Sequence, residues 1–257
     1  MSAAAPIVVG MGAETDLSAL TDATTHGFAA TVVLLRDGAH GLEVLLIERP
    51  RDRGSFAGAW VFPGGLVEAS DADSVAEAGG DLASEAASRR AAARETEEEV
   101  GLVVDEASLV PFSKWTPPAG SPKHLVTTFF AARAPEGRTK PSPDEVMALE
   151  WLTPQDALDR HAAGSMTLWP PTWVTLAGLR PAKTVDDALA EFAVGDVQPY
   201  VSRFNDDRTT IFWKEDEAYD DPHHDDHPAV PDDAPDAVGN RHRLMMDRLP
   251  WIYLNDF

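Results

Sequence analysis

The 257-residue chain contains no cysteine, which excludes disulfide bonds, thiolate metal sites and cysteine nucleophiles. Basic residues are scarce, because 21 Lys and Arg stand against 43 Asp and Glu, a formal net charge of −22. A chain this acidic repels phosphate backbones and anionic lipid, so binding to nucleic acid or to a membrane surface is not expected. No apolar run approaches the roughly 20 residues of a membrane span, and residues 1–27 do not resemble a signal peptide. Together these absences predict a soluble cytoplasmic protein.

Apolar and β-branched runs predict strands along the first two thirds of the chain. Residues 28–36 and 43–48 flank a Gly-containing turn and predict a β-hairpin. Residues 84–100, rich in Ala, Glu and Arg and ended by Gly101, predict a helix. Further strands are predicted at residues 108–115, 123–132 and 145–152, and a further helix from Thr153, the N-cap, to about His161.

The last third of the chain has a weaker pattern. Residues 185–192 predict a helix and residues 209–213 a strand, while the apolar residues of 243–254 predict a segment that packs back on the body. Residues 215–236 are rich in Asp and Pro, which is typical of a solvated linker. The His and Asp cluster at 223–227 lies within it, so we expect any metal binding there to be adventitious.

A cluster of glutamates lies near the end of the predicted helix at 84–100. Each helical residue advances about 100°, so Glu95, Glu98 and Glu99 fall within an arc of about 100°, while Glu97 points to the other side. Three carboxylates on one face repel one another, and a hard cation such as Mg²⁺ removes that penalty. Arg94, one turn before Glu98, can orient the set. A bare acidic run is more often a solvated helix face, so the assignment depends on its surroundings.

Those surroundings resemble the Nudix box. A Phe-Pro-Gly-Gly turn ends at Gly65, and the later run Arg-Glu-x-x-Glu-Glu-x-Gly-Leu matches the family pattern. The matching positions are Gly65, Arg94, Glu95, Glu98, Glu99, Gly101 and Leu102. Two departures are present, because Thr96 replaces an aliphatic residue and Asp71, which stands where the pattern has Glu, precedes Arg94 by 23 positions. About 15 residues are therefore inserted, in a loop-like segment at about 72–84.

The run from Phe56 to Asp71 resembles the peroxisomal acyl-coenzyme A diphosphatases, whose Nudix box also carries an insertion. The segment from Leu45 to Gly58 partly resembles the coenzyme A signature of that branch, although Gly54 stands where the signature has an arginine. The same segment contains three arginines within an acidic chain, and guanidinium groups suit phosphate oxygens. These candidate substrate-binding residues are Arg49, Arg51 and Arg53.

The resemblance implies an α/β Nudix-type α/β/α sandwich with a mixed β-sheet. We expect an N-terminal extension at 1–27, the hydrolase domain at 28–168 and a C-terminal elaboration at 169–257. It also implies a catalytic set of Arg94, Glu95, Glu98 and Glu99, with Mg²⁺ or Mn²⁺ held by the three glutamates and the Gly65 carbonyl. The implied reaction is hydrolysis of a pyrophosphate bond in coenzyme A or acyl-coenzyme A.

Two alternatives stay open at the sequence level. The substrate can be NADH, ADP-ribose or a nucleotide sugar, or the domain can be a non-catalytic nucleotide sensor. The expected partner is a small-molecule nucleotide or coenzyme A substrate, and a homodimer is left open.

Overall fold

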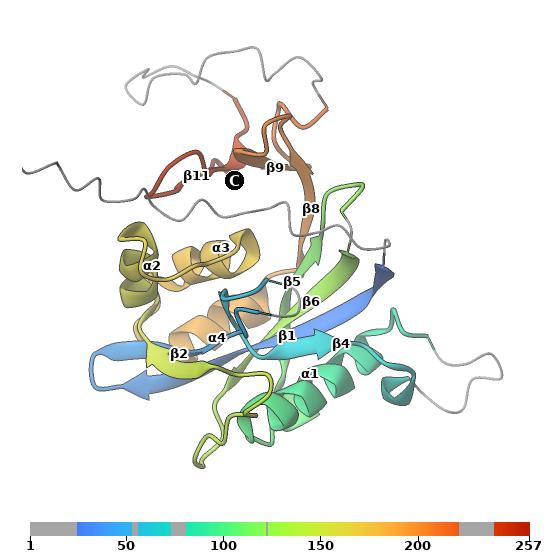
Figure 1. The fold of residues 1–257 in the computed structure, drawn as a ribbon, viewed down its shortest axis with the longest axis vertical. Coiled ribbons are helices and arrows are strands. Elements are labelled where there is room, and N and C mark those ends of the chain that lie inside the picture. Colours follow the sequence, from blue (N-terminus) through green and yellow to red (C-terminus); the bar gives the residue numbers. More distant parts are fainter. Residues whose placement is uncertain (1–24, 53–55, 73–80, 122, 221–238) are drawn as a thin grey trace, which may run out of the picture.

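A computed structural model describes residues 25–52, 56–72, 81–121, 123–220 and 239–257 (Figure 1). Two short 3₁₀ helices, at Ala69–Asp71 and Glu106–Ser108, accompany the α-helices. The α-helices are α1 Glu85–Val100, α2 Pro154–Ala162, α3 Pro170–Leu179 and α4 Val185–Val194. The strands are β1 Thr25–Gly38, β2 Gly41–Glu48, β3 Trp60–Val61, β4 Gly64–Leu66, β5 Val110–Thr116, β6 Lys123–Arg133, β7 Ala148–Leu152, β8 Gln198–Phe204, β9 Thr210–Trp213, β10 His242–Met245 and β11 Ile252–Asn255.

The described strands form one mixed sheet in the order β11-β10-β9-β8-β5-β6-β1-β2-β3, with β4 paired to β1 and β7 paired to β2. The long central pair β1 and β6 is parallel, from Thr25 opposite Lys123 to Leu35 opposite Arg133. The pair β5 and β8 is also parallel, and β1 with β4 is antiparallel. This arrangement confirms the predicted mixed sheet and places β4 beside the middle of the sheet.

Helices cover both faces of the sheet, which gives a three-layer sandwich (Figure 1). Because side chains alternate along a strand, Val32 and Leu34 of β1 face the cluster around α1, whereas Val33 and Leu35 face the other cluster. The second cluster contains Leu158 of α2, Leu176 of α3 and Ala188 of α4. The predicted α/β/α architecture is therefore confirmed.

Helix α1 begins and ends close to where the sequence predicts. The Ser84 side chain accepts a hydrogen bond from the Ala87 amide at 3.2 Å, which caps the first turn. Gly101 ends the helix with a left-handed φ of 71°, and its amide donates to the Glu97 carbonyl. Thr96 is fully buried and donates to the Ala92 carbonyl at 2.7 Å, so its hydroxyl is satisfied within the helix.

The C-terminal third extends the same sheet. Strands β8–β11 follow β5, and Trp213 and Leu244 join the cluster that contains Val33. The segment at 243–254 does pack back on the body, as predicted.

The prediction of a solvated linker is wrong at its first residues. Asp216 is 4% exposed and accepts hydrogen bonds from the Arg243 guanidinium at 2.8 Å and from the His242 amide at 2.7 Å. Ion pairing makes burial of this carboxylate tolerable, which composition alone did not indicate. Residues 221–238, including the His and Asp cluster, lie outside the described part.

Across the described ranges, no helix is long and apolar enough to cross a membrane.

Candidate active site

The turn Pro63-Gly64-Gly65 is fixed against strand β1. The Pro63 carbonyl accepts the Thr31 hydroxyl at 2.6 Å and the Val32 amide at 2.9 Å. A Cβ atom on Gly65 would overlap the Glu95 carboxylate, and one on Gly64 would overlap the backbone of Ala30 and Thr31. Gly64 is therefore required by the close approach of the turn to β1, and a side chain at Gly65 would displace the Glu95 carboxylate from the turn.

Glu99 is the most buried of the predicted ligands, with a side chain 5% exposed. Its Oε2 accepts the Gly64 amide at 2.9 Å, and its Oε1 lies 3.7 Å from an Arg49 terminal nitrogen. Burial raises the pKa of Glu99 to about 7, although the Gly64 amide and Arg49 favour the ionised form. Glu99 thus joins the glycine turn to the end of β2.

Glu95 and Glu98 share Arg94 but differ in exposure. The Glu95 side chain is 16% exposed and lies 2.9 Å from Arg94, and its pKa is raised chiefly by burial. The Glu98 side chain is 54% exposed and lies 3.1 Å from the same guanidinium nitrogen. Glu97 is exposed on the other side of the helix, as the helical phase predicts. Glu95 and Glu99 converge on the glycine turn, whereas Glu98 lies at its solvent edge.

Asp71, whose role the sequence left open, is the anchor of Arg94. Its two oxygens accept hydrogen bonds from Arg94 Nε at 3.1 Å and Nη2 at 2.9 Å. Burial alone would raise the pKa of Asp71, but the hydrogen bonds from Arg94 and from the Glu68 amide outweigh it, so the pKa is lowered. Arg94 also donates to the Leu66 carbonyl at 3.0 Å. This ion pair therefore joins the two halves of the box, which lie on either side of the insertion.

The three predicted substrate-binding arginines occupy different places. Arg49 lies beside Glu99, and its Nε is buried without a hydrogen-bond partner in the part of the chain that the structure describes. Arg51 donates from Nε to buried Glu48 at 2.8 Å, and its side chain is 80% exposed. Arg53 lies outside the described residues. The structure brings Arg49 into the site and directs Arg51 to Glu48.

Sequence reasoning missed Glu145, whose charge contributes to raising the pKa of both Glu95 and Glu99. Its loop is fastened to the end of α1 by backbone hydrogen bonds, from Lys140 to the Val100 carbonyl and from Ser142 to the Glu99 carbonyl. Glu145 follows the box by more than forty residues, so no local pattern could have found it. A fourth carboxylate thus acts on the same charge cluster.

The residues at this site supply donors suited to a hard cation. Carboxylate and backbone carbonyl oxygens are the ligands that Mg²⁺ and Mn²⁺ prefer, and two carboxylates converge on the turn, Glu99 at Gly64 and Glu95 at Gly65. Within the described ranges no group of three or more His, Asp or Glu side chains is already arranged to hold a metal ion. Arg94 donates to one oxygen of Glu95 and to one oxygen of Glu98, and so holds the two side chains beside each other. The donor chemistry of the site fits a hard divalent cation.

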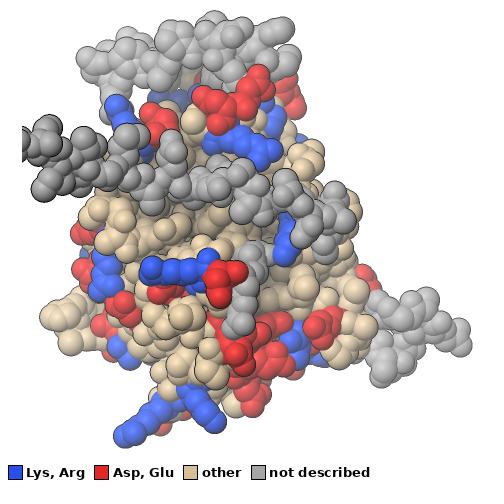
Figure 2. Space-filling view, in the orientation of Figure 1, with Lys and Arg blue, Asp and Glu red and all other residues tan. Residues whose placement is uncertain are grey.

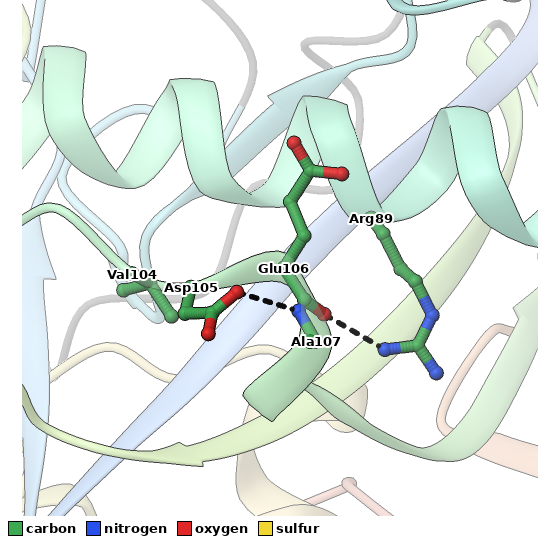
Figure 3. A pocket seen from close by; sticks show the side chains of 5 residues that line it. All are labelled: Arg89, Val104, Asp105, Glu106 and Ala107. Atoms are coloured by element: carbon green, nitrogen blue, oxygen red, sulfur yellow. Dashed lines mark hydrogen bonds between the residues drawn. The ribbon is translucent and has the colours of Figure 1, made fainter.

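Acidic side chains gather over α1 in the lower part of the view in Figure 2. A separate, open depression is lined by Arg89, Val104, Asp105, Glu106 and Ala107 (Figure 3). Arg89 there donates to the Glu106 carbonyl at 3.0 Å and to Glu85, so its guanidinium serves the local structure. None of the predicted site residues lines this depression.

The sequence profile of the NUDIX domain matches residues 25–170, more than half of the chain, so the chain belongs to the NUDIX family. Members of the family commonly use divalent metals, and the match indicates that the protein is a hydrolase. No curated protein sequence matches the chain significantly.

Three solved structures resemble the chain, and the first of them shares its fold. A NUDIX hydrolase from Alicyclobacillus acidocaldarius superposes with a TM-score of 0.58 at 23% identity, covering 67% of this chain and 99% of that one. A MutT NUDIX hydrolase from Burkholderia pseudomallei is 26% identical over 60% of this chain and 97% of its own, with a TM-score of 0.42. The NUDIX domain of Shewanella oneidensis NrtR, complexed with ADP ribose, is 17% identical over 65% and 93%, with a TM-score of 0.45.

Proposed function

We propose that this protein hydrolyses the pyrophosphate bond of coenzyme A or acyl-coenzyme A, giving 3′,5′-ADP and phosphopantetheine or its acyl derivative. The observation that carries the hydrolase function is the convergence of Glu95 and Glu99 on the Gly64-Gly65 turn. Arg49 stands beside Glu99 with an unpaired Nε–H, a donor suited to a phosphate oxygen.

Glu95, Glu98, Glu99 and the Gly65 carbonyl would hold one to three Mg²⁺ or Mn²⁺ ions. Bound divalent cations supply positive charge to pyrophosphate oxygens and lower the pKa of water. The protein's own contribution is positional, because Arg94 connects Asp71 to Glu95 and Glu98. Carboxylates held in this way would fix the position of the cations, whose positive charge would offset the negative charge that spreads over the phosphoryl oxygens in the transition state.

The coenzyme A assignment is supported by sequence, namely the segment from Leu45 to Gly65 and the insertion within the box. The basic loop at 49–53 adds an electrostatic reason, because coenzyme A carries a 3′-phosphate besides its pyrophosphate. Arg49 faces the site, and exposed Arg51 is free to exchange Glu48 for a substrate phosphate.

A substrate panel tests the proposal. Coenzyme A, acyl-coenzyme A, NADH, ADP-ribose, a nucleotide sugar and nucleoside triphosphates are incubated with Mg²⁺, and the products and kcat/KM are measured. We expect coenzyme A esters to have the highest kcat/KM, and the Glu99→Gln variant to be inactive on all of them.

The outcomes separate the parts of the proposal. A tenfold preference for a dinucleotide or nucleotide sugar, about 1.4 kcal/mol in transition-state binding, would refute the coenzyme A assignment and leave the hydrolase. Nucleotide binding without turnover of any compound would mean that the domain is a sensor.

A further inference from the structure

Two aromatic side chains from distant segments meet beside the basic loop. The rings of Phe56 and Trp169 lie 4.5 Å apart between centroids, at an interplanar angle of 71°. Phe56 is 40% exposed and Trp169 is half-buried. Neither ring belongs to the two apolar clusters of the described core. The pair therefore contributes little to the interior and presents aromatic surface to solvent.

Short backbone links join this pair to the candidate active site. The Phe56 carbonyl accepts the Ala59 amide at 3.0 Å, and the Ala59 carbonyl accepts the Arg49 amide at 2.9 Å. The three peptide steps from Phe56 to Ala59 span at most about 11 Å. On the other side, the Trp60 amide donates to the Thr167 carbonyl at 2.9 Å, which fixes the segment that precedes Trp169. The backbone that carries Phe56 is thus hydrogen-bonded, through Ala59, to the backbone of Arg49 at the edge of the site.

Phe56 is held in an uncommon backbone conformation. Its φ is 58°, in the left-handed region that residues with a Cβ atom seldom adopt. Such residues persist where surrounding structure enforces them, and they concentrate at ligand-binding sites. The backbone strain occurs at a residue whose side chain is not part of the apolar core, which favours a role in ligand binding over a role in stability.

We propose that Phe56 and Trp169 bind the purine base of the nucleotide substrate. This inference rests on the proposed hydrolase function and adds the residues that hold the base. The ring surface that this edge-to-face pair leaves exposed is a face on which a flat heterocycle can stack. Stacking on aromatic side chains is available to any base, so the pair sets the position of the nucleotide while Arg49 and the carboxylates engage its phosphates.

Binding of two matched ligands tests the inference without turnover. Adenosine 5′-monophosphate and ribose 5-phosphate differ by the base alone, and their affinities for the full-length protein are measured by calorimetry. We expect adenosine 5′-monophosphate to bind at least about tenfold more tightly. Phe56→Gly, which removes the ring and relieves the backbone strain, and Trp169→Ala should each reduce this ratio at least fivefold, with the ribose 5-phosphate affinity unchanged.

Trp173→Phe is the matched control, because Trp173 lies one turn further along α3 and packs against Trp251 and Tyr253. Its affinity ratio should equal that of the parent, and a thermal melt shows that each variant is folded. An unchanged ratio in both Phe56→Gly and Trp169→Ala would refute base stacking.

Other outcomes distinguish this inference from the proposed function. If the parent binds both ligands equally, or binds neither, yet hydrolyses a diphosphate substrate, the inference fails and the function stands. If the parent shows a base-dependent ratio that both variants abolish, yet hydrolyses nothing, the inference stands for a nucleotide-binding domain and the hydrolase function fails.

Discussion

Four glutamates within one helical turn occupy four different environments. Glu99 is buried and bonded to the Gly64 amide, and Glu95 is largely buried beside Gly65. The Glu98 side chain is about half exposed, and Glu97 is exposed to solvent. A helix that only displayed charge would expose its carboxylates alike. The two least exposed carboxylates are instead the two that lie against the glycine turn, Glu99 and Glu95, which agrees with a site built at that turn.

The first prediction separates a metal site from a solvated acidic face. Glu99→Gln keeps the side chain's size and its bond from Gly64 but removes an anionic ligand, so kcat should fall by at least about 10²-fold, or roughly 2.7 kcal/mol. Glu97→Gln is the matched control and should stay within a few-fold of the parent. Thermal melts should show that Mg²⁺ stabilises the parent and the Glu97 variant more than the Glu99 variant. Equal activity and equal Mg²⁺ response in both variants would contradict the site.

The second prediction concerns the Asp71 anchor. Asp71→Asn removes one of the three carboxylates that pair with Arg94, at a place where both side chains are largely buried. We expect unfolding to become easier by about 1–3 kcal/mol and kcat to fall about tenfold, because Arg94 loses its anchor and no longer fixes the positions of Glu95 and Glu98. Asp186→Asn, which breaks an exposed ion pair with Arg133, should leave both quantities unchanged. Chemical denaturation and steady-state kinetics measure both effects, and loss of stability with full activity would show that Arg94 has no positioning role.

At the scale of elements, helix α1 was predictable because its signals are local. Ser84, the absence of Gly and Pro, and Gly101 define its ends, and its helical period places the glutamates. The Asp71–Arg94 ion pair and the approach of Glu145 were not predictable, because they depend on segments far apart in sequence that only the folded sheet brings together. The family match covers 25–170, and the sequence pattern was weakest beyond it.

Helix α3 and strands β8, β10 and β11 were not assigned from sequence as separate elements. Two prolines open α3, a pattern that also suits a turn, and β8 depends on a parallel partner more than eighty residues away. Buried polar residues in β10 add to the difficulty, because His242 is 3% exposed. Its ring nitrogens lie 3.1 Å from Glu215 and 2.9 Å from the Tyr253 hydroxyl, so the strand is polar by sequence yet interior by packing.

The third prediction follows from that buried histidine. Burial lowers the pKa of His242, although Glu215 and Asp216 favour the charged form. The unfolded imidazole takes up a proton near pH 6.5 while the folded one resists, so the unfolded state binds more protons and stability falls as the pH drops below about 6.5. His242→Gln should flatten the decline in unfolding free energy between pH 7 and 5.5 by up to about 1.4 kcal/mol per pH unit. His40→Gln, at an exposed position, is the control, and equal slopes in the two variants would contradict the assignment.

At the scale of the whole molecule, the apolar cluster on the α2–α4 face contains residues from within the family match at 25–170 and residues beyond it. Trp213 of β9 is fully buried and packs edge-on to Trp115 of β5 at 5.9 Å, and Leu244 of β10 lies in the same cluster as Val33 of β1. A cluster shared in this way couples the two parts, because neither can bury its face alone. We therefore expect the C-terminal strands to unfold together with the central sheet.

The last prediction tests that coupling through Trp213, whose indole N–H has no hydrogen-bond partner in the described residues. Trp213→Ala should cost about 3–5 kcal/mol from lost packing, whereas Trp213→Phe keeps a ring, removes the unpaired donor and should cost less than about 1.5 kcal/mol. Hydrogen exchange at buried amides shows which strands lose stability. In the alanine variant, the β1 amides near Val33 and the β10 amides near Leu244 should lose protection by the same factor, because one cooperative unit opens. Faster exchange in β10 with unchanged protection in β1 would instead show a separate C-terminal unit, and the shared cluster would then be a docking contact between two independently folding parts.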